Sequence, residues 1–122
     1  MFNTNKMTIK AQEALQDAYT KASKAKNSQI EPAHLLSALI SQDDGLIRPL
    51  LNKVGINTEL LISGLNGLLA KLPTVSGAQQ VYISNDTNQA VEYAFELMEK
   101  MKDEFVSTEH LLLGIIEKAD SN

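Results

Sequence analysis

The sequence contains no cysteine among its 122 residues, and only 5% of its residues are aromatic. Without cysteine, disulfide bonds, thiol catalysis and cysteine-based zinc sites are excluded. Because aromatic side chains are few, a core has to be filled mainly by leucine, isoleucine and alanine, which suits packed helices. An apolar fraction of 43% at this length is enough for one domain that buries about two-thirds of its unfolded surface.

An excess of basic residues and a long apolar run are also missing. The formal net charge is −4, and an acidic chain is a poor match for nucleic acid or an anionic membrane, since both attract a basic face. No apolar run approaches the ~20 residues of a membrane span, and the residues after Met1 do not form a signal peptide. We therefore expect a cytoplasmic domain whose partners include neither nucleic acid nor a membrane.

Motifs that carry chemistry are absent as well. The pattern G-x-x-x-x-G-K-[ST], whose backbone amides cradle phosphates, does not occur. The only histidines, His34 and His110, have no HExxH spacing, so we favour two histidines in the first turns of helices over a metal site. The acidic pairs Asp43–Asp44 and Asp103–Glu104 lie between helical segments and are typical of turns. We expect no catalytic residue, metal or cofactor on this chain.

An internal repeat is the main feature that is present. The sequence matches itself at an offset of 76 residues, the distance from His34 to His110. Residues 30–36 (IEPAHLL) then fall on residues 106–112 (VSTEHLL), and apolar or small residues coincide upstream and downstream. Self-similarity at a fixed offset indicates a repeated architecture. The pattern predicts an all-α fold with a duplicated helical repeat.

Four helices are expected in the first repeat. Thr8 is a candidate N-cap for a helix that reaches about residue 25, and Glu31–Pro32 opens a second helix with proline in its first turn. A short third helix over about 46–54 ends at Gly55, and a fourth follows to about residue 69. The stripe that we expect to be buried in the first helix is Ala11, Leu15, Ala18, Ala22 and Ala25.

Only two helices are expected in the second repeat, with Ser84 and Ser107 as their N-caps. We therefore expect one domain over 1–122, with repeat one over about 8–70, a linker over about 71–82 and an incomplete, truncated repeat two over about 84–122. The missing helix pair would expose an apolar patch and promote self-association. That patch would include Leu112, Ile115 and Ile116. In the first helix of the second repeat, the stripe that we expect to be buried is Thr87, Val91, Ala94, Met98 and Met101.

Several strings of the sequence identify a family resemblance. EPAHLLSALI and STEHLLLGII occupy equivalent places in the two repeats, and together residues 8–117 resemble the Clp N-terminal repeat domain of the Clp/Hsp100 AAA+ unfoldases, an all-helical pseudo-twofold module. TIKAQEAL, LLNKVGIN and LPTVSG are most similar to the ClpB-type disaggregases. The resemblance implies an accessory domain that binds unfolded or aggregated polypeptide weakly and passes it to a hexameric AAA+ ring. ATP and magnesium would belong to motor domains absent from this chain.

Two other functions stay open. STEHLLLGI is also similar to strings of ClpC- and ClpA-type proteins, so the chain could be an adaptor-docking domain of a protease-coupled unfoldase. A spacer without a substrate of its own is the third possibility.

The resemblance to ClpB-type domains implies a polar cluster of Thr8, Asp103 and Glu109 that chaperone function requires. Each residue also has a structural explanation. Thr8 can cap its helix, Glu109 can favour the positive end of a helix dipole, and Asp103 can belong to a turn.

The same resemblance implies a substrate-binding groove at Tyr93, Leu97 and His110. Tyr93 and Leu97 are one helical turn apart and lie off the main apolar stripe, so both could face an incoming side chain. Related domains usually carry aliphatic residues at positions 93 and 110. The groove of this chain would therefore be more polar at its rim.

Overall fold

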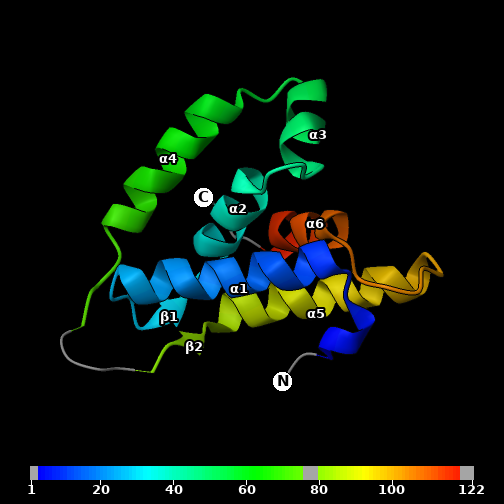
Figure 1. Cartoon of the computed structure of the whole chain (residues 1–122), viewed down its shortest axis with the longest axis horizontal. Helices are drawn as coiled ribbons and strands as arrows, with labels where there is room; N and C mark the ends of the chain where they lie inside the picture. Colours follow the sequence, from blue (N-terminus) through cyan, green and yellow to red (C-terminus); the bar gives the residue numbers. More distant parts are fainter. Residues whose placement is uncertain (1–2, 76–79, 119–122) are drawn as a thin grey trace.

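The computed structural model describes residues 3–75 and 80–118, and this part of the chain is mainly helical (Figure 1). It contains one short 3-10 helix, six α-helices and two strands of two residues each, which confirms the all-α fold. No helix of the described part is long and apolar enough to cross a bilayer. The elements are η1 Thr4–Lys6, α1 Ile9–Lys24, β1 Gln29–Ile30, α2 Pro32–Ser41, α3 Ile47–Lys53, α4 Thr58–Ala70, β2 Tyr82–Ile83, α5 Asn85–Lys100 and α6 Thr108–Lys118.

The bounds of the helices show the duplication directly. Helices α1 and α5 each have 16 residues and begin 76 positions apart (85 − 9 = 76), and α2 and α6 begin at the same offset (108 − 32 = 76). The N-caps of α1 and α5 are also equivalent, because the Thr8 and Ser84 hydroxyls each accept a backbone N–H three positions on at 3.1 Å. The capping pattern in the sequence therefore predicted where these helices begin.

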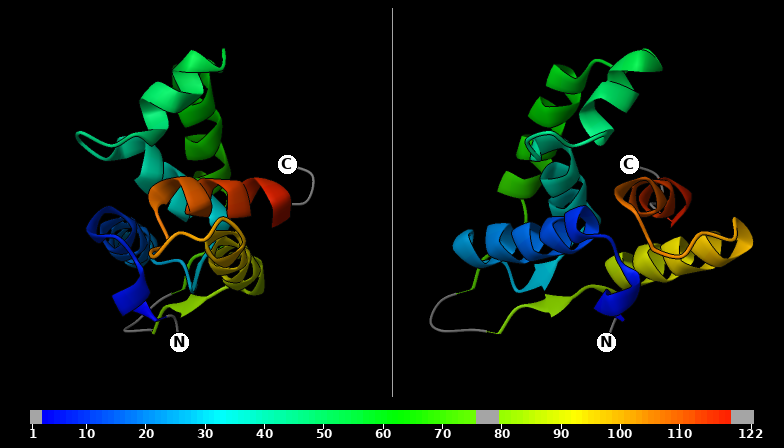
Figure 2. Two further views of the ribbon diagram at one scale, coloured as in Figure 1. Left: turned by 90° about the vertical axis from the view of Figure 1, so that its right-hand side faces the viewer. Right: turned by 45° about the vertical axis from the view of Figure 1, so that its right-hand side comes forward.

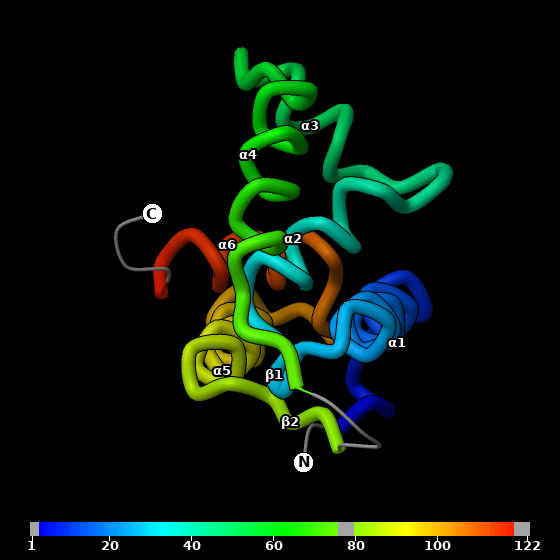
Figure 3. The backbone as a smooth tube through the Cα atoms, turned by 90° about the vertical axis from the view of Figure 1, so that its left-hand side faces the viewer, coloured from blue at the N-terminus to red at the C-terminus, as the bar shows by residue number. Residues whose placement is uncertain are grey.

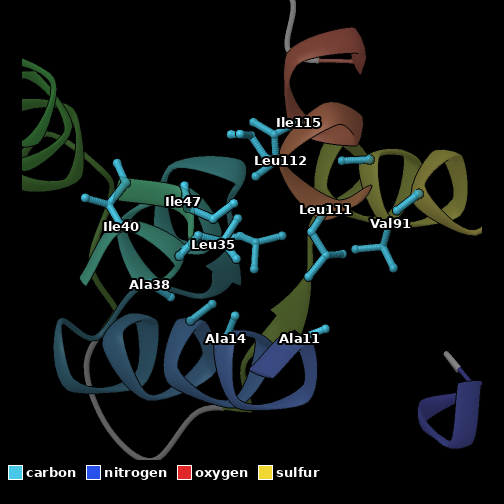
Figure 4. Close-up of a cluster of buried hydrophobic side chains, with 14 of the residues drawn as sticks. Ala11, Ala14, Leu35, Ala38, Ile40, Ile47, Val91, Leu111, Leu112 and Ile115 are labelled. Carbon is cyan, nitrogen blue, oxygen red and sulfur yellow. The ribbon is translucent and has the colours of Figure 1, made fainter. Parts of the chain in front are cut away.

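The helices form three levels. Helices α1 and α5 form the base, α2 and α6 lie above them, and α3 and α4 project beyond (Figures 1 and 2). Aliphatic side chains from α1, α2, α5 and α6 fill the space between the lower levels, among them Ala14, Leu35, Val91 and Leu111 (Figure 4). This core draws on both repeats, which supports a single packed unit.

A short strand, β2, lies where the predicted linker ends. Residues 76–79 of that linker lie outside the described residues. Next to them, β2 pairs in parallel with β1, with Ile30 opposite Ile83 (Figure 3). An isolated parallel bridge joins Met7 to Val106, and these are the equivalents of Ile83 and Ile30 at the offset of 76. The sequence did not predict either pairing, because two residues are too few for an alternating pattern.

Burial corrects several expectations. Ala25 and Met101 are exposed rather than buried, because each is the C-cap of its helix. Leu112 and Ile115 are each only 5% exposed, since α6 packs against α2 and α3 of the first repeat. Of the three residues expected to be exposed there, only Ile116 is, at 62%.

Candidate functional site

A pocket of about 680 Å³ lies between η1 and the turn that joins α5 to α6. Among its described lining residues, three carry a carboxylate, two are phenylalanines and one is a methionine. One of the three acids is Asp103, which was predicted from the sequence as a site residue. We call it the acidic pocket. It is lined by Asn3, Asn5, Lys6, Phe95, Met98, Glu99, Asp103, Glu104 and Phe105.

Backbone hydrogen bonds hold the two sides of the acidic pocket together. The chain leaves α5 through Lys102, whose φ of 60° is left-handed, and the Asp103 N–H donates to the Met98 carbonyl at 3.0 Å. Farther along the turn, the Val106 N–H donates to the Lys6 carbonyl at 2.7 Å. The N-terminal segment is thereby fixed against the α5–α6 turn, although the two are far apart in sequence.

His110 supports this turn from inside. Its Nδ1 accepts the Ser107 N–H at 2.9 Å, so Nε2 carries the proton and donates to Asp103 Oδ2 at 3.0 Å. His110 is only 5% exposed, whereas the Asp103 side chain is 47% exposed. The histidine therefore orients a carboxylate that solvent and ligands can reach.

His34 has the same arrangement in the first repeat. Its Nδ1 accepts the Glu31 N–H at 2.8 Å, and its Nε2 lies 2.9 Å from Asn27 Oδ1. Burial lowers the pKa of His34 below its ordinary value of 6.5, and the nearby Lys21 lowers it further. The equivalent of the amide Asn27 is Asp103 (103 − 27 = 76), so the second repeat carries a charge where the first is neutral.

The structure brings part of the predicted polar cluster together. The Thr8 N–H donates to the Val106 carbonyl at 2.9 Å, which places Thr8 next to the turn that carries Asp103. Thr8 also caps α1, as its sequence context indicated. Glu109 lies half-buried in the first turn of α6 and is not among the described residues that line the acidic pocket.

The residues of the predicted groove differ in burial, and none of them lines the acidic pocket. His110 is buried beneath Asp103, while Tyr93 and Leu97 are half-buried on α5 and do not line the acidic pocket. The Lys118 ammonium of α6 lies 5.2 Å from the centre of the Tyr93 ring, a distance at which a cation and an aromatic face attract each other. Tyr93 thus has a partner within the chain.

The lining of the acidic pocket is suited to binding a ligand that carries both apolar and cationic groups. The side chains of Phe95, Met98 and Phe105 offer apolar and aromatic surface, and Glu99 and Glu104 add negative charge beside Asp103. Cationic and apolar groups on one ligand would both be stabilised there. In the described part of the chain, no three histidine or carboxylate side chains are grouped so that they could hold a metal ion.

Sequence reasoning missed Phe95, Glu99 and Phe105 as site residues. At the offset of 76, Phe95 falls on Tyr19 (95 − 19 = 76), a match of two aromatic residues that does not distinguish a core position from a surface position. Yet Phe105 is 45% exposed, although only three phenylalanines occur in the chain. A scarce aromatic residue beside two acids in a turn is the signal that could have indicated a binding surface.

Comparison with known proteins identifies the family. The sequence profile of the Clp repeat N-terminal domain matches residues 6–122. The chain belongs to this Clp N domain family. Among curated proteins, this Clp N domain is 41% identical over 114 residues to the chaperone protein ClpB of Rhodopirellula baltica and 42% identical over 109 residues to ClpB of Mycobacterium leprae. These matches cover 93% and 88% of the chain but only 13% of each relative.

Solved structures agree on the fold. The Hsp104 N-terminal domain from Candida albicans has a TM-score of 0.85 at 24% identity, covering 93% of this chain and 75% of that one. The ClpV N-domain in a complex with VipB peptide has a TM-score of 0.76 at 14% identity, covering 95% and 71%. At such identities the likeness concerns the arrangement of helices alone.

Proposed function

We propose that this Clp N domain is a substrate-binding accessory domain of a ClpB-type chaperone, which engages unfolded or aggregated polypeptide weakly and passes it to an ATPase ring. The observation that carries the proposal is the acidic pocket with Asp103 at its edge. Unfolded chains expose apolar residues next to lysines and arginines, and the pocket combines surface for the first with charge for the second. The ClpB relatives support the same role.

Weak binding follows from the exposure of the pocket. Ion pairs between exposed side chains contribute about 0–1 kcal/mol each, so carboxylates at the rim favour basic segments without holding them tightly. A domain that hands on its substrate needs this ease of release. In our proposal the hexameric ring, its ATP and its magnesium belong to other parts of a cytoplasmic protein.

Titration of the isotope-labelled domain with a permanently unfolded, apolar and basic polypeptide tests the proposal by NMR. We expect shifts at Phe95, Glu99, Asp103 and Phe105, since these residues line the acidic pocket. Shifts confined to Tyr93 and Leu97 would move the site to the groove implied by family resemblance. The absence of any shift at high micromolar concentration would contradict substrate binding by this domain.

Asp103→Asn separates the charge of the pocket from its structure. Asparagine already accepts the equivalent bond from His34 in the first repeat, so the variant should keep the turn while losing the carboxylate. We expect binding of a lysine-flanked apolar peptide to weaken about two- to fivefold and to depend less on salt. Glu96→Gln is the matched control, because Glu96 is exposed on α5, the helix before the turn that carries Asp103, but does not line the pocket.

Equal binding by Asp103→Asn, Glu96→Gln and the unaltered protein would contradict the role of the pocket. An adaptor-docking domain is the alternative, and the peptide held by the ClpV N-domain shows that a similar fold can take a defined partner. Binding of a folded adaptor, with inertness towards unfolded chains, would favour that function. If the domain bound neither unfolded chains nor a folded adaptor, the spacer function would be favoured.

A further inference from the structure

A second groove lies between α1 and β2. Its volume is about 590 Å³, and none of its described lining residues also lines the acidic pocket. Figure 3 shows β2 on the outer side of β1, with α1 to one side. We call it the strand groove, and it is lined by Thr4, Ile9, Gln12, Glu13, Leu15, Gln16, Tyr19, Ile30, Val81, Tyr82, Ile83 and Thr87.

Among the described residues, the outer edge of β2 has backbone groups without a hydrogen-bond partner. The N–H groups of Tyr82 and Ser84 donate to the carbonyls of Ser28 and Ile30, at 3.1 and 3.2 Å. Since strand residues alternate in the direction of their backbone groups, Ile83 directs its N–H and C=O away from β1. No described residue pairs with either group of Ile83. An open edge of this kind is a template for another strand.

In the first repeat, the backbone carbonyl at the equivalent position has a hydrogen-bond donor from a side chain. Met7 is the equivalent of Ile83 (83 − 7 = 76), and the Met7 carbonyl accepts a hydrogen bond from Gln12 Nε2 at 3.0 Å. The equivalent of Gln12 is Asn88 (88 − 12 = 76). The Asn88 amide donates instead to Glu92 at 3.1 Å. Within the described part of the chain, the Ile83 carbonyl therefore lacks the side-chain donor that the Met7 carbonyl has in the first repeat.

Charge and surface chemistry in the strand groove select the kind of ligand. Glu13 is the only charged side chain among the twelve described lining residues, so the groove favours a cationic group. Ile9 and Tyr82 are 73% and 60% exposed, which leaves apolar surface without cover on both walls. A peptide with alternate apolar side chains and one lysine or arginine matches these features.

We propose that the strand groove takes an extended segment of unfolded polypeptide as an added strand beside β2. Its backbone bonds with Ile83, its alternate apolar side chains pack against α1, and its basic residue lies beside Glu13. The ligand class rests on the proposed function, but the surface and the mode of binding differ from those of the acidic pocket. Backbone recognition tolerates many sequences, as capture of unfolded chains requires.

A pair of peptides tests the mode of binding. The first alternates leucine and threonine with one lysine, and the second has the same side chains but N-methyl groups on the residues that would face β2. We expect the first to shift NMR signals of residues 9–19 and 81–83, and the second to bind more weakly by about tenfold or more, since it has lost backbone donors. Equal affinity of the two peptides would overturn strand addition.

Substitutions at position 88 test the open edge from the protein side. Asn88→Gln lengthens the side chain so that it can reach the Ile83 carbonyl as Gln12 reaches that of Met7, and we expect it to weaken binding of the first peptide. Asn88→Ala is the control, because it also loses the bond to Glu92 but cannot close the edge, and it should bind normally. Equal affinity of the two variants, both checked for folding by circular dichroism, would contradict the proposal.

A charge exchange locates the basic residue. Glu13→Lys should weaken binding of the lysine peptide, and replacing that lysine by glutamate should restore it. Shifts confined to the acidic pocket would overturn the strand groove and leave the proposed function intact. Shifts confined to the strand groove would support strand addition and would contradict the assignment of substrate binding to the acidic pocket.

Discussion

At the scale of single residues, His34 and His110 perform one task with two different partners. Each accepts the N–H of the residue that precedes its helix and donates to a side chain seven positions earlier. Because Nδ1 of His34 is occupied as an acceptor, the neutral form of that ring fits its site. The partner of His34 is an amide, so nothing in that bond compensates a proton on the buried ring.

His34 should therefore make stability depend on pH. Its pKa is lowered by burial and by Lys21, so below about pH 6.5 the unfolded chain binds a proton that the folded chain does not. We expect the free energy of unfolding in urea to fall as pH decreases through this value towards about 5. His34→Gln should flatten the dependence over this range. An equally steep dependence in the variant would assign the effect to other groups.

Single residues also show which features of the candidate site could be predicted from the sequence and which could not. Thr8 was correctly expected to cap its helix, because an N-cap depends on residues only a few positions away. His110 was expected in a groove, yet it is buried against Asp103. Such a contact depends on how the turn after α5 folds, which local pattern does not determine. The acidic pocket was missed for the same reason, since it joins η1 to a turn about 100 residues later.

At the scale of elements, the contact between α5 and α6 depends on one small residue. A methyl group at Gly114 would collide with the backbone carbonyl of Ala90, and a backbone atom cannot move aside as a flexible side chain can. Gly114 therefore permits the close approach of the two helices. The repeat alignment matched Gly114 with Ala38, so sequence alone indicated a small residue without indicating that alanine would be too large.

Gly114→Ala should destabilise the domain by about 1–3 kcal/mol, because overpacking against a backbone outweighs the higher helix propensity of alanine. Chemical denaturation monitored by circular dichroism measures this change. Gly67→Ala is the matched control, since Gly67 lies inside α4 with nothing within 4 Å of its added methyl group. The control should gain about 0.5–1 kcal/mol. A stabilised Gly114→Ala would show that the helices can separate without cost.

Helices were more predictable than strands for a physical reason. Helical spacing of apolar residues and N-caps such as Ser84 are features of neighbouring residues, so the start of a helix such as α5 could be located from the sequence. The pairing of Ile30 with Ile83 spans 53 positions (83 − 30 = 53). This pairing forms only where the packed helices bring β1 and β2 together, and a short window of sequence carries no information about that packing.

At the scale of the whole molecule, the two repeats interlock instead of lying side by side as independent units. Helix α2 contacts α5 and α6, α1 contacts α6, and β1 pairs with β2. These contacts also explain why Leu112 and Ile115 are buried. Neither repeat encloses a core by itself, so the lower levels should open in one cooperative step.

Helices α3 and α4 should behave differently. Within α4, Leu65 is buried but Leu60 and Leu68 are 70% and 46% exposed, and the helix projects away from the base (Figure 2). Hydrogen exchange should therefore be faster in α4 than in α1, α2, α5 and α6, which should share one slow rate set by global unfolding. Mass spectrometry of exchanged peptides measures this pattern. If α1 and α2 exchanged at one rate and α5 and α6 at another, the repeats would be separate units, and the shared core would not govern stability.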